Sequence, residues 1–317
     1  MIKMNQVNSL NTDPKNTLNN IQHEKKNKDY IHVNPWKMLF MWLPLLHIKF
    51  KAAKIVRKNK KQPDRYSEEY RYNWVKKAVS KLLYVLDVNI KVEGIENWMD
   101  KGVVLAANHQ SNIDPAILFA INDFSKQQPL AFIAKEELWT SKKFKNFVRL
   151  VDCIPLNRKS PRSALEAFKE AKDLVVEYKR SLVIFPEGTR SHSQEMNSFQ
   201  AASLKVAQMS HAPIIPVSII NSYLVFAEKR PKKVEVKVVF GKPILPNKHI
   251  SLKTEDLTRV VEKNVSSNLK KWENKEMKYE LKKLTKKDIK QLKEEEKKQK
   301  DKKTTKKSIK DLFKIVD

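Results

Sequence analysis

The chain has 317 residues, of which 41% are hydrophobic, and this suffices for one core of ordinary size plus extensions. A formal net charge of +28, from 64 Lys and Arg against 36 Asp and Glu, indicates a polyanionic partner surface, either nucleic acid or an anionic membrane leaflet. The single cysteine, Cys153, excludes an internal disulfide, and its apolar surroundings favour a buried, unreactive thiol.

Residues 1–34 are rich in Asn, Lys, Gln and Thr and carry no sustained apolar period, so we expect them to be disordered. The first apolar run begins only after this polar stretch, which is not the pattern of a signal peptide.

Residues 35–86 are predicted to form a helical segment at a membrane interface. The apolar run 38–46 is far shorter than the ~20 residues needed to cross a bilayer. Trp36, Phe40 and Trp42, together with flanking lysines, fit a helix lying at headgroup level. The alternative is a helix packed on the domain's own core. A second, amphipathic helix is predicted over 64–86.

Residues 87–269 alternate between apolar strand candidates and helix candidates. The predicted strands are 90–92, 103–107, 131–134, 151–156, 182–185, 214–220 and 234–240, and the predicted helices are 115–121, 161–178 and 199–209. The helix at 161 has Ser160 as its N-cap and Pro161 at its first position, with Leu165, Phe168, Ala171 and Val175 facing the core. The alternation predicts an α/β domain with a mixed, largely parallel sheet flanked by helices and with ligands beyond the strand ends.

Residues 270–317 contain nineteen lysines and ten acidic residues. We expect a charged helix that fades into disorder. It either rests on anionic lipid or serves only as a solubilising tail.

A histidine and an aspartate flank a predicted turn after the buried strand 103–107. His109 stands at the carboxyl end of that strand, where open sheets place functional residues. Asp114, followed by Pro115, has the pattern of an N-cap. A turn between the two would let the carboxylate reach the imidazole, fix its tautomer and leave the other ring nitrogen to take a proton. Alone, the pair is a weak signal, because a solvated loop histidine and a simple helix cap explain it better.

A second block, 185–191, reads Phe-Pro-Glu-Gly-Thr-Arg-Ser and follows the strand 182–185, so it lies at the same end of a parallel sheet. Gly188 is one of only four glycines, and the planar guanidinium of Arg190 suits a phosphate. Glu187 could hydrogen-bond a hydroxyl or fix Arg190. Arg158 also follows a strand, and these strand ends suggest a pocket for a phosphate and a hydroxyl. The alternative for either arginine is a surface ion pair.

These blocks resemble those of the glycerolipid acyltransferase family, the lysophosphatidate acyltransferase group. The family's blocks are Asn-His-x4-Asp, a strand ending in Arg, Phe-Pro-Glu-Gly-Thr-Arg-Ser and a late Pro-rich strand. Here they occur in that order at 108–114, 153–158, 185–191 and 213–217. The resemblance covers roughly residues 85–245 and identifies 87–269 as the acyltransferase domain.

The resemblance implies that His109 is the catalytic base and Asp114 its partner. It implies that Arg158 and Arg190 hold the acceptor's phosphate, while Glu187, Gly188 and Thr189 shape the acceptor site. A backbone N–H near Gly188 is a candidate oxyanion donor. Lys169 is the nearest candidate for an assisting lysine, although a solvated helix face explains it better.

This sequence departs from the family at two places. Gln200-Ala201-Ala202 follows Phe199 where the family has a basic residue and a glycine. Lys179-Arg180-Ser181 precedes the third strand where the family often has a glycine.

The expected function is transfer of a fatty acyl group from acyl-CoA or an acyl carrier protein to lysophosphatidate, at the cytoplasmic face of an anionic membrane. No metal or cofactor is expected, since no His, Cys or Asp cluster has ligand spacing. Other acceptors, such as glycerol-3-phosphate or a lysophospholipid, remain open. A basic nucleic-acid-binding protein lacks supporting signatures, and the intact His, Asp and Glu-Gly-Thr-Arg set argues against an inactive lipid-binding relative.

Overall fold

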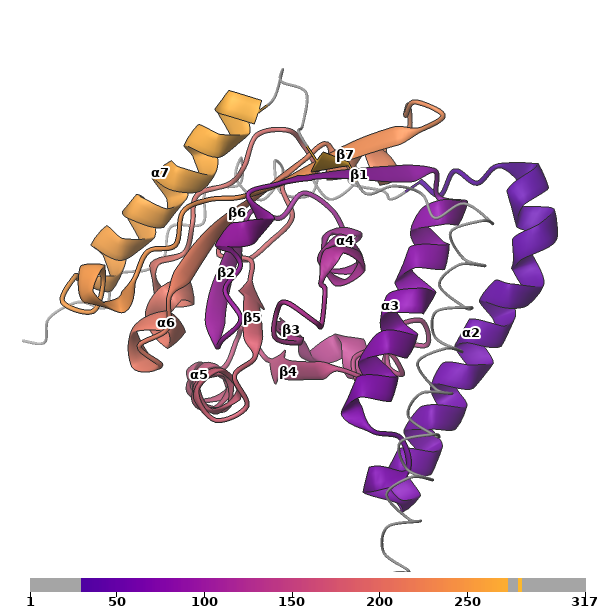
Figure 1. Ribbon diagram of the computed structural model, residues 1–317, viewed down its shortest axis with the longest axis horizontal. Coiled ribbons are helices and arrows are strands. Elements are labelled where there is room, and N and C mark those ends of the chain that lie inside the picture. Colours follow the sequence, from indigo (N-terminus) through magenta and orange to yellow (C-terminus); the bar gives the residue numbers. More distant parts are fainter. Residues whose placement is uncertain (1–29, 273–278, 281–317) are drawn as a thin grey trace, which may run out of the picture. The chain divides into compact units, whose positions relative to one another are not determined.

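The computed structural model describes residues 30–272 and 279–280 (Figure 1). Apart from a two-residue strand at 279–280, the elements considered below belong to the unit of the chain that ends at Tyr279. The expectations for the polar N-terminus and for the Lys-rich tail fall almost entirely outside the described residues.

The described helices lie where apolar periodicity and capping residues coincide. They are α2 (Pro35–Lys61), α3 (Glu68–Val85), α4 (Asp114–Ile121), α5 (Pro161–Val176), α6 (Lys205–Met209) and α7 (Thr254–Trp272). The side-chain oxygen of Asn34 accepts the N–H of Trp36 at the start of α2. The Ser160 hydroxyl accepts the N–H of Ser163 at the start of α5, which confirms the predicted N-cap.

Seven strands follow the order β4-β3-β5-β2-β6-β7-β1 in one sheet. They are β1 (Val88–Glu93), β2 (Val103–Ala107), β3 (Leu130–Lys135), β4 (Asp152–Leu156), β5 (Ser181–Ile184), β6 (Ile214–Ile220) and β7 (Val234–Phe240). A two-residue strand, β8 (Tyr279–Glu280), follows. The five strands from β4 to β6 run parallel, whereas β7 pairs antiparallel with β6 and parallel with β1. This confirms the predicted mixed, largely parallel sheet and brings the carboxyl ends of five strands to one edge.

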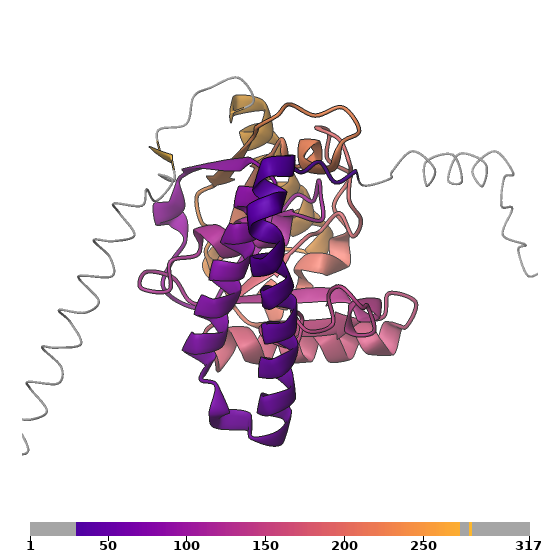
Figure 2. The same ribbon diagram turned by 90° about the vertical axis from the view of Figure 1, so that its right-hand side faces the viewer.

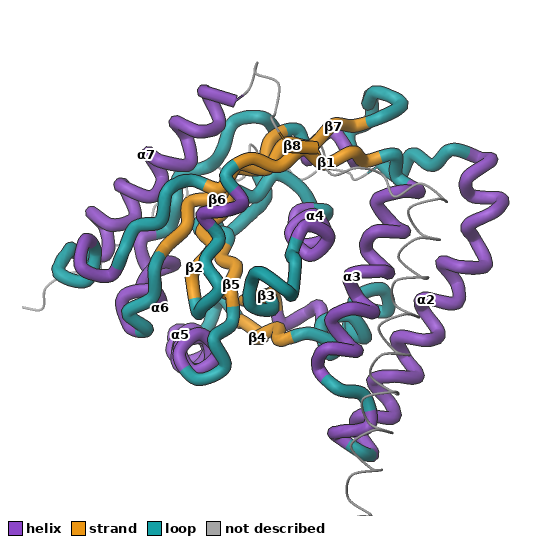
Figure 3. The backbone as a smooth tube through the Cα atoms, in the orientation of Figure 1, coloured by secondary structure: helices purple, strands orange, loops and turns teal. Residues whose placement is uncertain are grey.

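Helices cover both faces of the sheet (Figure 3). On one face, α5, α6 and α7 pack on the strands in a core of Val, Ala, Leu and Ile side chains. On the other face lies α4, which contacts α3, and α3 in turn contacts α2. All five residues of β2 are buried, as expected for a central parallel strand covered on both sides.

Helices α2 and α3 lie side by side on the outside of this second face (Figure 2). Ala52 and Ile55, both in the second half of α2, are its fully buried residues, and the first half is attached to the domain by Lys37, whose ammonium group donates to the carbonyl of Tyr84 at 2.9 Å and pairs with Asp87. In its first half, large apolar side chains remain exposed, and Trp36 and Phe40 are 72% and 74% exposed. Within the described residues, no helix combines the length and apolarity that a bilayer crossing needs.

Arg180, one of the departures from the family pattern, connects α3 to the sheet. Its side chain is only 8% exposed and forms ion pairs with Glu68 on α3 and with Asp152 on β4, where the nitrogen–oxygen distance is 2.6 Å. The Tyr72 hydroxyl reinforces this junction by donating to the carbonyl of Leu130, 2.8 Å away. Arg180 therefore fixes α3 to the edge of the sheet.

Several predicted elements need correction. The helix predicted over 64–86 begins at Glu68, because a 3-10 turn at Pro63–Arg65 precedes it and Ser67 caps the new start. The helix predicted over 199–209 is a 3-10 turn (Ala201–Leu204) followed by the five-residue α6. Leu165 was expected in the core but is 51% exposed, and Ala167 is buried instead. Helix α7 was not predicted.

Candidate active site

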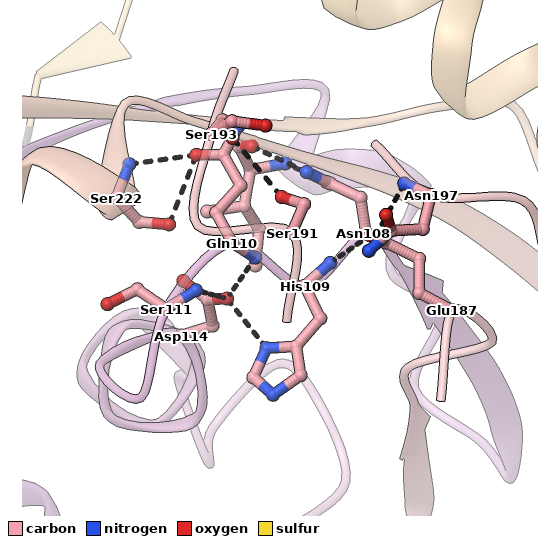
Figure 4. Close-up of polar contacts among 11 residues, drawn as sticks. Asn108, His109, Gln110, Ser111, Asp114, Glu187, Ser191, Ser193, Asn197 and Ser222 are labelled. Carbon is pink, nitrogen blue, oxygen red and sulfur yellow. Dashed lines mark hydrogen bonds and ion pairs between the residues drawn. The ribbon is translucent and has the colours of Figure 1, made fainter. Parts of the chain in front are cut away.

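His109 and Asp114 meet at the carboxyl end of β2. The Nδ1 atom of His109 lies 2.8 Å from Oδ2 of Asp114, so the turn between them brings the two side chains together as expected (Figure 4). The imidazole is 18% exposed and the carboxylate is fully buried. A buried carboxylate beside Nδ1 favours the tautomer that carries its proton on Nδ1.

The carboxylate of Asp114 does not cap α4, contrary to the sequence-based expectation. Asp114 is the first residue of the helix, and the N-cap is Ile113. Its Oδ2 atom points back along the chain and accepts the backbone N–H groups of Gln110 and Ser111 at 2.8 and 2.9 Å, in addition to facing His109. Three donors thus hold one oxygen, which fixes the orientation of the carboxylate.

The ring of Phe185 stacks on one face of the His109 imidazole. The ring centroids of His109 and Phe185 are 4.1 Å apart, and the planes are inclined by 24°. In Figure 4 the second ring nitrogen, Nε2, points away from Asp114 and from the other labelled polar groups. The imidazole is therefore held on one edge and one face, with Nε2 directed outward.

Glu187 is a buried bridge between two segments of main chain. Its Oε1 atom accepts the N–H of His109 at 2.6 Å, and its Oε2 atom accepts the N–H of Asn197 at 2.8 Å. Burial raises the pKa of Glu187, although both hydrogen bonds act in the opposite direction. With each oxygen bonded to backbone, this carboxylate holds His109 and the loop that follows β5.

That loop carries Gly188, Thr189 and Arg190 close to His109. Gly188 has φ +70°, and an added Cβ would meet only Cγ of Gln200 at 3.6 Å, so the backbone conformation rather than space requires glycine. The N–H of Gly188 itself donates to the carbonyl of Phe185 at 3.0 Å and closes a turn. Next to Arg190, the N–H of Ser191 donates to the carbonyl of His109 at 2.8 Å.

Arg158 and Arg190 lie at different distances from His109 along the edge of the sheet. Arg190 follows β5, the direct neighbour of β2, whereas Arg158 follows β4, which is separated from β2 by β3 and β5. At ~4.8 Å per strand, this places the end of β4 roughly 14 Å from that of β2. Arg158 and Thr189 are exposed, and Arg190 is half-buried. Arg190 is therefore the arginine whose loop contacts His109 directly.

Asn108 is a site residue to which sequence reasoning assigned no role. It is fully buried, its amide donates to the carbonyl of Ile219 at 2.9 Å, and its oxygen accepts the N–H of the same residue at 2.6 Å. This pair of bonds fixes the start of the His109 turn to β6. Its position directly before the histidine could have drawn attention to it. No feature of the sequence, however, indicates that its hydrogen-bond partner is Ile219, 111 residues away.

The structure also describes Cys153 and Lys169, which the sequence analysis singled out. Burial raises the pKa of the Cys153 thiol to about 12, as expected for an unreactive cysteine. Lys169 is exposed on α5. Over the part of the chain that the structure describes, no three His, Cys, Asp or Glu side chains are grouped so that they could hold a metal ion.

A strand-end histidine held by a buried carboxylate, beside an arginine-bearing loop on an α/β sheet, is the arrangement expected of an enzyme that transfers a group to a hydroxyl of an anionic substrate. The family model described as Acyltransferase matches residues 89–220. A "Probable 1-acyl-sn-glycerol-3-phosphate acyltransferase" of Mycoplasma pneumoniae is 33% identical over 241 residues, which cover 72% of this chain and 89% of that protein. The corresponding protein of Mycoplasma genitalium is 34% identical, covering 64% and 79%.

A solved structure agrees with this result. The 1-acyl-sn-glycerophosphate (LPA) acyltransferase PlsC from Thermotoga maritima superposes with a TM-score of 0.60 at 26% sequence identity, covering 76% of this chain and 96% of that one. The chain belongs to the glycerolipid acyltransferase family, in the group of the 1-acyl-sn-glycerol-3-phosphate acyltransferases.

Proposed function

We propose that this chain transfers a fatty acyl group from a thioester donor to the free hydroxyl of 1-acyl-sn-glycerol-3-phosphate, forming phosphatidate. The hydrogen bond between His109 and Asp114 at the carboxyl edge of the sheet is the observation that carries the proposal. The names of the relatives in the two mycoplasmas and in Thermotoga support the same acceptor.

His109 acts as the general base in this reaction. Its outward Nε2 takes the proton of the acceptor hydroxyl while Asp114 holds Nδ1 and stabilises the imidazolium that forms. The hydroxyl oxygen attacks the thioester carbonyl, and the tetrahedral intermediate collapses by breaking the carbon–sulfur bond. The imidazolium then returns the proton to the departing thiolate. The acyl group passes directly between donor and acceptor, so no acyl-enzyme forms.

The acceptor's phosphate is held by Arg190 and Arg158. The loop of Arg190 is bonded to His109 through Ser191, so a phosphate on this loop brings the glycerol hydroxyl close to Nε2. Arg158, at the end of β4, contributes from farther along the edge. Glu187 supports the site through the backbone of His109 and Asn197, and Gly188 and Thr189 form the turn that presents Arg190.

Replacing either arginine by alanine is expected to raise the KM for lysophosphatidate by about tenfold or more, because a charge-assisted contact with phosphate is lost. The KM for the thioester should change less than twofold. Steady-state kinetics with each substrate varied in turn measure both values. Lys159→Ala removes an equal charge from an exposed neighbour of Arg158 and serves as the control. Equal rises in both KM values would contradict the phosphate role.

The acceptor and the donor are tested together with purified full-length protein. Lysophosphatidate, glycerol-3-phosphate and a lysophospholipid are offered with acyl-CoA or with acyl carrier protein, and both thiol release and the acylated product are measured. Phosphatidate from lysophosphatidate is the expected main product. Transfer to another acceptor alone would overturn the acceptor assignment. If no acyl transfer occurs and the purified protein binds nucleic acid instead, the basic nucleic-acid-binding alternative is favoured.

The protein also binds an anionic membrane surface through α2, at the cytoplasmic face of the membrane. Trp36, Phe40 and Phe50 all lie on α2 and expose most of their surface. Single exposed apolar residues are common on protein surfaces, whereas several large ones on one helix indicate an interaction site. The second half of α2 adds exposed basic side chains, at Lys54, Arg57, Lys60 and Lys61. Aromatic rings at headgroup depth beside lysine and arginine suit a helix lying in the interface.

Replacing Trp36 and Phe40 together by serine is expected to weaken binding to vesicles that contain anionic phospholipid by at least about tenfold, because burial of a large apolar side chain contributes roughly 1.5–3 kcal/mol. Cosedimentation measures the bound fraction. The matched control is the double variant Leu165→Ser and Tyr178→Ser, which alters two exposed apolar residues of and near α5. Equal vesicle binding by the two double variants would argue against α2 as the membrane contact.

A further inference from the structure

Gln110, the residue after His109, is fully buried and lies where three strands end. Its Oε1 atom accepts both the backbone N–H and the hydroxyl of Ser222, at 3.0 and 3.2 Å. Its Nε2 atom makes a longer contact of 3.5 Å with the carbonyl of Gln194, in the loop after β5. Its own N–H donates to Asp114. One residue therefore joins the turn after β2 to the segments that follow β5 and β6 (Figure 4).

The partner segment is a short 3-10 helix, Ser222–Phe226, that is itself fixed on several sides. Ser222 and Val225 are fully buried. The guanidinium of Arg230 donates to the carbonyl of Val225 at 2.9 Å. The N–H of Tyr30 donates to the carbonyl of Phe226 at 2.9 Å. This segment thus provides a rigid support against which a side chain can hold the catalytic turn.

The main chain of residues 110 and 111 matters because it orients the aspartate. Two of the three donors on Oδ2 of Asp114 are the N–H groups of Gln110 and Ser111, and the third is the His109 imidazole. A shift of residue 110 would move these donors, and the carboxylate would turn with them. The imidazole that the carboxylate holds would then change its direction.

We propose that Gln110 is a positioning residue for the acyl transfer, which fixes the His109–Asp114 pair by locking the turn between them to Ser222. This inference rests on the proposed function. Gln110 does not touch the reacting groups, and its contribution is to alignment. A misalignment of about 1 Å at a catalytic group can reduce a rate by roughly 100-fold without changing which substrates bind.

The test compares Gln110→Ala with Gln127→Ala in the full-length protein, using lysophosphatidate and the thioester donor that the wild type accepts. Gln127 is a matched control, since it is a buried glutamine whose Oε1 accepts the N–H of Asp123 at 2.8 Å, beyond the far end of α4. We expect Gln110→Ala to lower kcat by about 10- to 100-fold with both KM values within about twofold. Gln127→Ala should lower Tm similarly and leave kcat within about twofold.

The outcomes separate the two proposals. Lack of transfer by the wild type would refute the proposed function, whereas normal wild-type transfer with equal kcat in the two glutamine variants would refute the role of Gln110. If Gln110→Ala does not fold, Gln110→Asn decides, because the shorter side chain keeps an amide but withdraws its oxygen from both donors of Ser222. Gln127→Asn is the control, since it withdraws a buried amide oxygen from the N–H of Asp123 in the same way. Gln110→Asn is expected to lower kcat at least about threefold more than Gln127→Asn. Equal kcat values would overturn the inference.

Discussion

Replacing His109 by alanine is expected to lower kcat for acyl transfer by about 100- to 10,000-fold, the range over which general bases contribute to catalysis. The loss arises because no other ionisable side chain is hydrogen-bonded to the Asp114 carboxylate among the described residues. Product formation from lysophosphatidate and a thioester, measured at enzyme concentrations high enough to detect slow turnover, gives the ratio of rate constants.

Folding of the His109→Ala protein is checked by thermal unfolding, since the variant also loses the ring contact with Phe185. His211→Asn is a suitable control. His211 is an exposed histidine at positive φ, a conformation that asparagine tolerates. A His109→Ala protein that unfolds at the wild-type temperature and retains a substantial part of the wild-type rate would end the general-base proposal.

Replacing Asp114 by asparagine is expected to lower kcat by about 100-fold or more while changing either KM little. The amide has nearly the same shape, so the bonds from Gln110 and Ser111 to one oxygen can persist. That oxygen also faces Nδ1 of His109, but a neutral amide cannot stabilise the imidazolium by charge. In the flipped orientation the NH2 group would face Nδ1, which favours the wrong tautomer and loses both backbone bonds. The same kinetic assay, run with both substrates varied, separates kcat from KM.

Asp123→Asn provides the matched control for this variant. Asp123 lies just beyond the other end of α4, where its Oδ1 atom accepts the N–H and the hydroxyl of Ser125. Its replacement should weaken that local turn and leave acyl transfer unchanged. A kcat for Asp114→Asn close to that of Asp123→Asn would show that the carboxylate serves the fold alone.

Much of the fold could be predicted because the relevant signals are local. Strands β2, β6 and β7 match the predicted ranges residue for residue, since each is a short apolar run bounded by polar or turn-forming residues. Ser160 and Pro161 marked the start of α5 correctly. Helix α7 was missed although Leu257, Val261 and Val265 are spaced four residues apart and buried, because charged residues separate them and lower the apolar signal.

The contacts that build the candidate site could be predicted only in part. The pairing of His109 with Asp114 depends on a five-residue turn, and the sequence contains that information. The bridge from Glu187 to His109 joins residues 78 positions apart, and the bond from Ser222 to Gln110 joins residues 112 positions apart. Such contacts depend on the order of strands in the sheet. For the same reason, Asp114 could be mistaken for a helix cap until the backbone around residues 110 and 111 was placed.

The backbone of His109 is tied on both sides to the loop that carries Arg190, through Glu187 on its N–H and through Ser191 on its carbonyl. That loop cannot swing outward as a gate without releasing the histidine at the same time. If the lipid phosphate binds to this loop and the hydroxyl reacts at His109, as we propose, both steps use one preassembled frame. Little ordering of the loop then remains when the acceptor enters, so its binding carries a small entropic cost.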